Sequence, residues 1–303
     1  MALSTKTIRK SIRSIGNTKK ITKAMEMVSA SKMRKTVNAV MAARPYAQTA
    51  LAMVIDLAHR AGGFNQPLLK SRKKIKKICI ILLTANRGLC DGFNSQIINQ
   101  AINYTKKEKS KNPEIVCDWI AVGRKGADFL AHHNQRIIAE FEKLDIITSI
   151  FEVLPIVKMV VKDYLNESYD KVAIAYTNFN SAVNQKPEIR QILPLTSTLA
   201  KNLAKDEETK DLISQFEKYE YLFEPDPATV LNSVLPHLIE VNLYQYFLET
   251  IASEHASRML AMRNASDAAD EMINGLTLAY NQARQAAITR EIAEITGGKA
   301  ALE

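Results

Sequence analysis

The C-terminal part of the chain has the residue spacing of a long helix with one apolar face. Alternating steps of three and four residues from Met262 meet an apolar side chain eight times in succession, which is the pattern of a coiled-coil seam. The expected seam consists of Met262, Ala265, Ala269, Met272, Leu276, Ala279, Ala283 and Ala286. No proline follows Pro236, and Gly275 is the only glycine between His237 and Thr296. The sequence therefore predicts a helix of about 90 Å, which must span a bilayer or run beside another long helix. The seam favours the second option, and a long helix in an ordinary bundle is the alternative.

The N-terminal segment offers a partner for this helix, because it also lacks proline up to Pro45. Its apolar stripe, which contains phase slips, consists of Ile8, Ile12, Ile15, Ile21, Met25, Val28, Met33, Val37 and Val40. Ser4 or Thr5 can cap the start of the helix. We expect the helix to pass Pro45 with a kink and to end at Gly62-Gly63. Two long helices at opposite chain ends predict an antiparallel coiled coil.

Between these helices the pattern changes to that of an α/β domain. Short apolar runs predict strands over Ile75–Leu83, Ile115–Val122, Arg136–Phe141, Lys171–Thr177 and Ile189–Leu193. Helical patterns begin at Asn94 and cover Lys125–His133 and Ile147–Leu165. This alternation favours a mostly parallel, Rossmann-like sheet, with a hairpin at one edge whose turn lies in Asn178–Lys186.

The expected organisation follows from these elements. Residues 1–62 form the N-terminal coiled-coil helix, residues 63–212 the α/β domain, and residues 213–303 the C-terminal coiled-coil helix. An acidic stretch, Asp206 to Asp211, is expected to link the α/β domain to the last helix.

Composition sets the class of protein. The 303 residues are 47% apolar and 24% charged, which is typical of a globular protein and excludes a collagen, a disordered tail or a disulfide-rich miniprotein. The longest apolar run, Ile78 to Leu83, is far shorter than the roughly 18 residues that span a bilayer. The three cysteines are sparse and lack zinc-ligand spacing.

The net charge of +9 comes from the N-terminal segment. Residues 1–44 contain eleven lysines and arginines and one glutamate, a net charge of +10, whereas the rest of the chain has 30 basic and 31 acidic residues. We therefore expect an acidic surface on a partner of this segment.

The α/β region invites a nucleotide-binding interpretation, but its motif has the wrong spacing. Gly88 and Gly92 do not form G-x-G-x-x-G, no phosphate-binding P-loop motif occurs, and Asp91 would place a negative charge where a phosphate should bind. His132 and His133 are adjacent, so on a helix they diverge too far to share a metal. We expect no catalytic residues, no cofactor and no metal; bound dinucleotide would revive the alternative of a Rossmann-type enzyme.

Five sequence motifs nevertheless carry a specific resemblance. They are ITKAMEMVSASKMRK at Ile21–Lys35, TANRGLCDGFN at Thr84–Asn94, YLFEP at Tyr221–Pro225, EHASRMLAM at Glu254–Met262 and LAYNQARQAAITREIAE at Leu278–Glu294. In this order, over essentially the whole chain, they resemble the γ subunits of F-type ATP synthases, of the bacterial type. The chain departs from that family at Gly16, at Ala85-Asn86, where Ser-Asp is usual, and at Asp91, where a second glycine is usual.

The resemblance implies a non-catalytic subunit in which the two terminal helices form an asymmetric shaft inside an α3β3 ring. The α/β domain would contact the ε subunit and the membrane c-ring, and proton-driven rotation would drive the catalytic sites through different conformations. The expected location is peripheral, on the cytoplasmic face of the bacterial plasma membrane. The cysteine-bearing chloroplast insertion is missing, so thiol switching is not expected.

The same resemblance assigns contacts with the β subunits to individual residues. Lys20, Lys23 and Met25 should face an acidic β loop, and Arg284 and Gln285 should bind a β loop elsewhere on the shaft. Arg87 is a candidate β contact from the α/β domain. For the lysines the alternative is a solvated helix face, for Met25 a place in the coiled-coil core, and for Arg284 a side chain lying along the seam.

Two other hypotheses explain the basic segment. A nucleic-acid-binding arm would suit the charge, but no aromatic residue precedes Tyr46 and no known reading motif occurs; tight, steeply salt-dependent DNA binding would favour it. A mitochondrial presequence would suit the basic, acid-free residues 1–20. The family resemblance, which begins by about Ile8, argues against cleavage there.

Overall fold

The computed structural model describes residues 5–60, 66–72, 74–147, 149–195, 224 and 226–300. It divides into two compact units. We call residues 1–30 with 258–303 the helix-pair unit, and residues 31–257 the sheet unit. The predicted domain boundaries at 62/63 and 212/213, and the acidic linker, lie outside the described residues, so the predicted division stays a prediction.

Two long helices, α1 (Thr5–Arg60) and α7 (Pro227–Ala300), contribute to both units. Both helices were expected, but α7 starts ten residues before His237 and continues through Pro236. A proline removes one backbone donor and weakens a helix. Here Leu235, Leu238 and Ile239 are fully buried beside it, so tertiary packing holds the helix across the proline.

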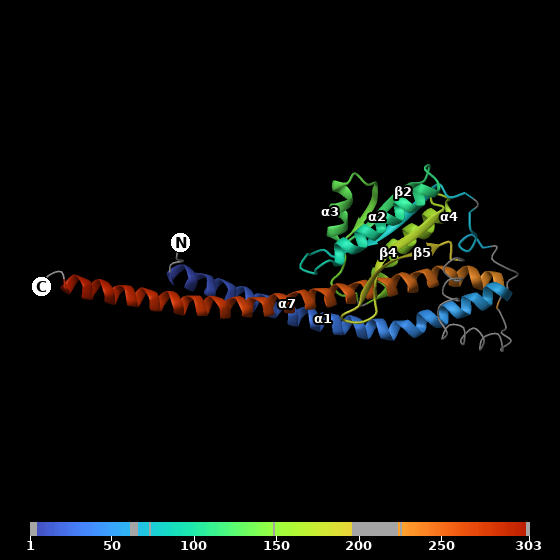
Figure 1. Cartoon of the computed structure of the whole chain (residues 1–303). Helices are drawn as coiled ribbons and strands as arrows, with labels where there is room; N and C mark the ends of the chain where they lie inside the picture. Colours follow the sequence, from blue (N-terminus) through green and yellow to red (C-terminus); the bar gives the residue numbers. More distant parts are fainter. Residues whose placement is uncertain are drawn as a thin grey trace. The chain divides into compact units, whose positions relative to one another are not determined.

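The sheet unit contains a five-stranded sheet in the order β3-β2-β1-β4-β5. The strands are β1 (Lys77–Leu83), β2 (Val116–Val122), β3 (Ile137–Phe141), β4 (Lys171–Phe179) and β5 (Gln185–Leu193). The first four are parallel, and β5 pairs antiparallel with β4 at the edge (Figure 1). The mostly parallel sheet with an edge hairpin is thus confirmed.

Alternate residues of β1 enter two different cores, because successive side chains of a strand point to opposite faces. Cys79, Ile81 and Leu83 join a large cluster that includes residues of α1, α4 (Leu154–Leu165) and α7. Ile78 and Ile80 join a second cluster with α2 (Phe93–Lys111) and α3 (Arg124–His132). The sheet is therefore covered on both faces, which explains its uninterrupted apolar strands.

Two local predictions need correction. The expected helix over Ile147–Leu165 is a short 3-10 helix, η1 (Ile150–Glu152), followed by α4. Pro155 lies in the first turn of α4, the part of a helix where proline is tolerated. The hairpin turn is also shorter than predicted, because β4 and β5 extend to Phe179 and Gln185.

Candidate functional site

Within the helix-pair unit, α1 and α7 run antiparallel in a defined register. The hydroxyls of Thr22 and Ser266 are 2.7 Å apart and buried, and Lys19 forms an ion pair with Asp270 one turn away. As the residue number rises on one helix it falls on the other. The predicted antiparallel pairing of the chain ends is confirmed.

The predicted seam of α7 is correct only in part. Met262 and Ala269 are buried, but Met272 is 57% exposed and Ala286 is also exposed. The covered positions near α1 include Ser266 instead, which is 3% exposed. The predicted seam includes these two exposed positions because α7 carries alanine or methionine on several faces, so hydrophobicity alone does not select one stripe.

The α1 side of the pair shows why a polar residue belongs in this seam. Ile8, Thr22 and Ser29 of this unit are buried, as is Thr36 in the sheet unit, and the four positions lie at multiples of seven residues, the coiled-coil repeat. Three of these four are hydroxyl residues, which an apolar pattern overlooks. In contrast, Ile21 and Val28, two members of the predicted stripe, are 62% and 55% exposed. Hydroxyl residues at seven-residue spacing are a weak signal for this seam, because Ser4, Ser11 and Thr18 have the same spacing and Thr18 is exposed.

Of the predicted contact residues of α1, Lys20 and Lys23 share one face of the helix, whereas Met25 lies about 140° or more around the helix from both. Lys20 and Lys23 are exposed and Met25 is half-buried. Lys23 also forms an ion pair with Glu26 at 2.8 Å, so its charge is partly compensated. This stretch presents cations to solvent beside the hydroxyl seam.

Arg284 and Gln285 lie on a part of α7 that is distant from the predicted contact residues of α1. Asp270 of α7 pairs with Lys19 of α1. Arg284 lies fourteen residues beyond Asp270 along α7, or about 21 Å of helix. Both side chains are exposed, as are all described side chains from residue 284 to 296, and α7 continues past the start of α1 (Figure 1). The structure does not bring this pair together with the three α1 residues.

Arg87 belongs to the sheet unit, in the loop that follows β1. Its side chain is exposed. Leu89 and Asp91 in this loop have positive φ angles of 62° and 51°, a conformation that favours glycine and tolerates aspartate better than most residues. The backbone at Asp91 therefore suits the glycine that the motif resemblance led us to expect there. Helix α2 begins directly after the loop.

A second polar region, which the sequence did not reveal, lies on α7 within the sheet unit. Five side chains, which we call the α7 anchor, bind the sheet or its loops: Thr250, Ser253, Glu254, His255 and Ser257. Thr250 accepts a hydrogen bond from the backbone N–H of Thr177 at 3.4 Å, and Ser253 donates to the Thr177 carbonyl at 3.2 Å. All of the anchor except Ser257 is buried.

The central contact of the α7 anchor is an ion pair between Glu254 and Lys143. Their side chains are only 5% and 3% exposed, and the Lys143 ammonium lies 5.9 Å from the centre of the Phe93 ring. Buried charges are costly unless they are paired, so each of these two groups depends on the other.

The loop that carries Lys143 also contacts α1. Asp145 in this loop forms an ion pair with Lys32 of α1 at 2.7 Å, and its backbone carbonyl accepts a hydrogen bond from His255. The hydrogen bond from Lys32 is the main cause that lowers the pKa of Asp145, and the charges of His255 and Arg87 act in the same direction. Asp145 is therefore held in its ionised form.

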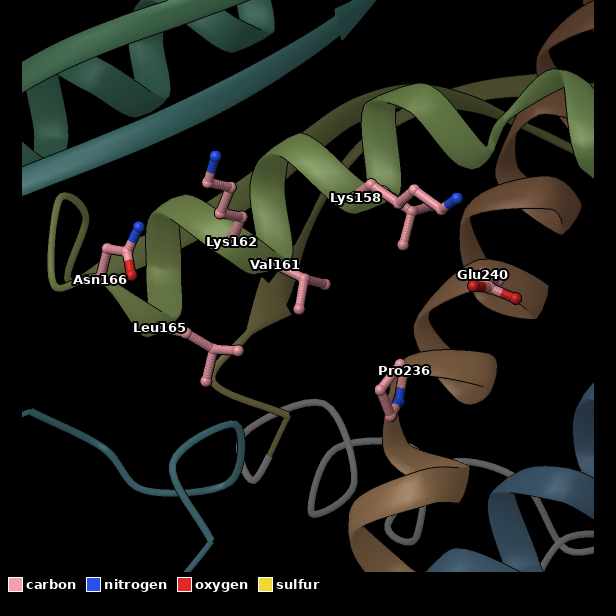
Figure 2. A pocket seen from close by; sticks show the side chains of 8 residues that line it. Lys158, Val161, Lys162, Leu165, Asn166, Pro236 and Glu240 are labelled. Atoms are coloured by element: carbon pink, nitrogen blue, oxygen red, sulfur yellow. The ribbon is translucent and has the colours of Figure 1, made fainter.

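One surface groove of the sheet unit lies between α4 and α7. Figure 2 shows a groove of about 310 Å³ where Val161 and Leu165 of α4 lie opposite Pro236 of α7, with Lys158 and Glu240 at its sides. Its lining is mainly aliphatic and offers no paired acid and base. Among the described residues, no cluster of three or more His, Cys, Asp or Glu could hold a metal ion. None of the described helices is sufficiently long and apolar to cross a bilayer.

The fold defines a class of protein in which the two chain ends pair as long antiparallel helices and a mostly parallel sheet binds one of them. The family model described as ATP synthase matches residues 4–302. Chains named ATP synthase gamma chain from Herpetosiphon aurantiacus and Legionella pneumophila are both 39% identical, over 99% and 98% of this chain and 99% of each relative. This chain belongs to the ATP synthase γ chain family.

Solved structures share the fold. A chain in the Euglena gracilis mitochondrial ATP synthase structure titled OSCP/F1/c-ring has a TM-score of 0.64 and 18% identity, covering 98% of this chain and 94% of its own length. A chain in the Tetrahymena thermophila structure of the mitochondrial central stalk and c-ring has a TM-score of 0.60 and 24% identity, covering 81% and 99%. These similarities concern the fold alone.

Proposed function

We propose that this chain is the rotor of the central stalk of an F-type ATP synthase. It couples proton-driven rotation of the c-ring to conformational cycling of the α3β3 catalytic sites and carries no catalytic residue itself. The observation that carries the proposal is the antiparallel pair of chain-terminal helices, registered by Thr22 and Ser266, in a chain that resembles bacterial γ chains over its full length. The nucleic-acid alternative has no support from these relatives.

The required physical property is asymmetry. Three equivalent catalytic sites can be driven into different conformations only by contacts that differ among them. Shifting one site from 1:99 to 99:1 needs roughly 5.5 kcal/mol of differential contact. Exposed ion pairs, worth about 0–1 kcal/mol each, can supply such differences in small steps and still release during rotation.

The proposed β contacts are those expected from the sequence. Lys20, Lys23 and Met25 would meet an acidic β loop from the α1 side of the helix-pair unit, where both lysines are exposed. Arg284 and Gln285 would bind a second β loop, about 21 Å of helix beyond Asp270. Arg87 would contribute a contact from the sheet unit.

The proposed partners are the α and β subunits, the ε subunit and the c-ring. The mitochondrial structures with the same fold are described as assemblies that include F1 and the c-ring in one case and the central stalk and c-ring in the other. The bacterial relatives are named ATP synthase gamma chains. We place this chain at the cytoplasmic face of the bacterial plasma membrane, as a peripheral subunit.

Charge reversal at the α1 contact tests the proposal. In membranes from a bacterium that lacks its own γ subunit, the wild-type chain should assemble with α and β and restore proton-driven ATP synthesis. The double variant Lys20→Glu/Lys23→Glu should assemble but synthesise ATP several-fold more slowly per complex, because two small attractive contacts become repulsive.

A matched control is Lys10→Glu/Arg13→Glu, which makes the same charge change at exposed positions of the same helix. This variant should keep the wild-type rate. Equal rates for both double variants would contradict the residue assignment. Failure of the wild-type chain to support coupled synthesis would contradict the rotor function.

A further inference from the structure

The α7 anchor holds α7 to the sheet by directional bonds that come from separate segments of the sheet unit. Thr250 and Ser253 bind the backbone of β4. Ser257 donates to the side-chain oxygen of Gln185, at the start of β5, at 3.2 Å. Glu254 and His255 bind the loop after β3, through the Lys143 ammonium and the Asp145 carbonyl, the latter at 2.9 Å.

These bonds leave the helix in more than one direction. Successive residues of a helix are about 100° apart, so Thr250, Ser253, Glu254 and Ser257 share an arc of about 100°, and His255 lies about 100° from Glu254. Apolar packing is non-directional, so it opposes rotation of α7 through the apolar area that rotation would expose and not through particular bonds. Hydrogen bonds to fixed backbone groups and a buried ion pair, in contrast, specify one angular position and one register.

The loop that receives Glu254 is itself fixed to the end of β1. The Asn86 amide donates to the Lys143 carbonyl at 2.6 Å, and its side-chain oxygen accepts from the backbone N–H groups of Lys143 and Arg124, at 3.4 and 3.3 Å. An ionised aspartate at this position could accept both of these backbone hydrogen bonds but could not donate to the Lys143 carbonyl. Asn86 precedes Arg87, so the proposed contact loop is linked to α7 through Lys143.

We propose that the α7 anchor, with the Lys143–Glu254 pair at its centre, is the torque-bearing connection that makes α7 turn with the α/β domain. Glu254 and Lys143 are positioning residues that touch neither nucleotide nor the catalytic sites. This inference rests on the proposed rotor function. It adds the place where rotation of the α/β domain is transferred to α7, the helix that continues into the helix-pair unit.

The first test removes the directional bond together with both charges of the pair. Lys143→Met/Glu254→Met replaces both ions by apolar side chains of similar length, a change that commonly preserves stability. In the assembled complex, the melting temperature should stay near the wild-type value. The ratio of proton-driven ATP synthesis to ATP hydrolysis should fall about threefold, within the range by which single contacts alter coupling.

Three further variants separate positioning from folding. Glu254→Gln should lower the same ratio, and the exchanged pair Lys143→Glu/Glu254→Lys should recover most of it. Glu249→Gln makes the same chemical change on the same buried stretch of α7, at a residue whose side chain binds Gln245 of its own helix. This control should leave the ratio unchanged.

Two results would contradict the proposal that the α7 anchor transmits torque. One is a wild-type ratio in Lys143→Met/Glu254→Met complexes that assemble and melt normally; the other is an equal loss in Glu249→Gln and Glu254→Gln. These results leave the rotor function intact, provided that the wild-type chain supports coupled synthesis. If the wild-type chain does not, the rotor function and the anchor are both wrong.

Discussion

The helix-pair unit and the sheet unit bury different kinds of side chain. In the described part of the helix-pair unit the buried residues are Ile8, Thr22, Ser29, Arg258, Met262, Ser266 and Ala269. In the sheet unit, β1 alone buries six successive apolar residues, Ile78 to Leu83. The helix-pair unit therefore has a thin, partly polar contact that leaves most of each helix exposed to partners. The sheet unit has two apolar cores and uses polar bonds to set the position of α7.

The glycines show the same contrast. Gly16 and Gly275, in the helix-pair unit, have no atom within 4 Å of the place where a Cβ would lie. At Gly123, in the sheet unit, φ is +96° and a Cβ would lie 2.2 Å from the Thr84 carbonyl oxygen. The Thr84 hydroxyl also donates to the Gly123 carbonyl and accepts from the N–H of Gly126. The first two glycines loosen a helix, whereas Gly123 is required by a close backbone approach.

The largest expected effect comes from a core substitution in the sheet unit. Trp119 is fully buried in β2, and Trp119→Ala should lower the free energy of unfolding by about 3–5 kcal/mol through lost burial and the cavity that remains. Met262→Ala in the helix-pair unit should cost less, about 2 kcal/mol, because its site is lined by only two helices and can collapse. Urea unfolding of the full chain, followed by circular dichroism, measures both. Equal losses would contradict the contrast between the units.

The second prediction uses the two kinds of glycine. Gly123→Ala should destabilise the chain by at least about 2 kcal/mol, because alanine at this positive φ is strained and its methyl group meets the Thr84 backbone. Gly275→Ala should stabilise it by about 1 kcal/mol, since alanine is the better helix former at an open position. Thermal unfolding of the two variants should show shifts of opposite sign. A destabilised Gly275→Ala chain would mean that this helix face is closely packed.

The third prediction concerns the polar seam. Thr22→Val keeps the side-chain shape but leaves the buried Ser266 hydroxyl without its 2.7 Å partner, at an expected cost of about 1–3 kcal/mol. The double variant Thr22→Val/Ser266→Ala removes both hydroxyls and should recover most of the loss. Unfolding of the two single variants and the double variant gives the coupling energy. Additive losses would show that the hydroxyls do not act as a pair.

The architecture could be predicted from sequence because the signals are strong where burial is apolar. The strands of the sheet unit are covered on both faces and read as continuous apolar runs, and β5 carries the hairpin pattern. The seam of α7 was misassigned at Met272 because several faces of that helix are equally apolar. Seam positions such as Thr22 and Ser29 are chosen by the fit between two helices, which a hydrophobic count of one helix does not contain.

The candidate site also contains residues that the sequence could predict and residues that it could not. The exposed Lys20, Lys23, Arg284 and Gln285 could be selected by family resemblance, because their motifs are continuous in sequence. The contacts of the α7 anchor could not be predicted from the sequence, because Glu254 and Lys143 are 111 positions apart in the chain. Neither residue type indicates burial by itself, because lysine and glutamate are normally exposed. Their pairing becomes visible only when the loop after β3 is placed against α7.

The smallest effect should come from a buried charge that is not part of the anchor. Burial raises the pKa of Glu249 above its ordinary value of 4.5, and the hydrogen bond from Gln245 and the charges of Arg44 and Arg190 oppose this only in part. Because the folded-state pKa is the higher one, the ionised carboxylate weakens the fold at neutral pH, and stability is recovered as the pH falls through that pKa toward 4.5.

Glu249→Gln should therefore stabilise the chain at pH 7, and the gain should vanish at a pH well below the ordinary value. Its new amide can also donate to the Gln245 side-chain oxygen, which is buried and has no hydrogen-bond partner among the described residues. Glu271→Gln, at an exposed position of the helix-pair unit, serves as the control and should change stability little at either pH. Urea unfolding at pH 7 and pH 3 measures both variants. A gain for Glu249→Gln that is the same at both pH values would show that the new hydrogen bond, and not the removed charge, stabilises the chain.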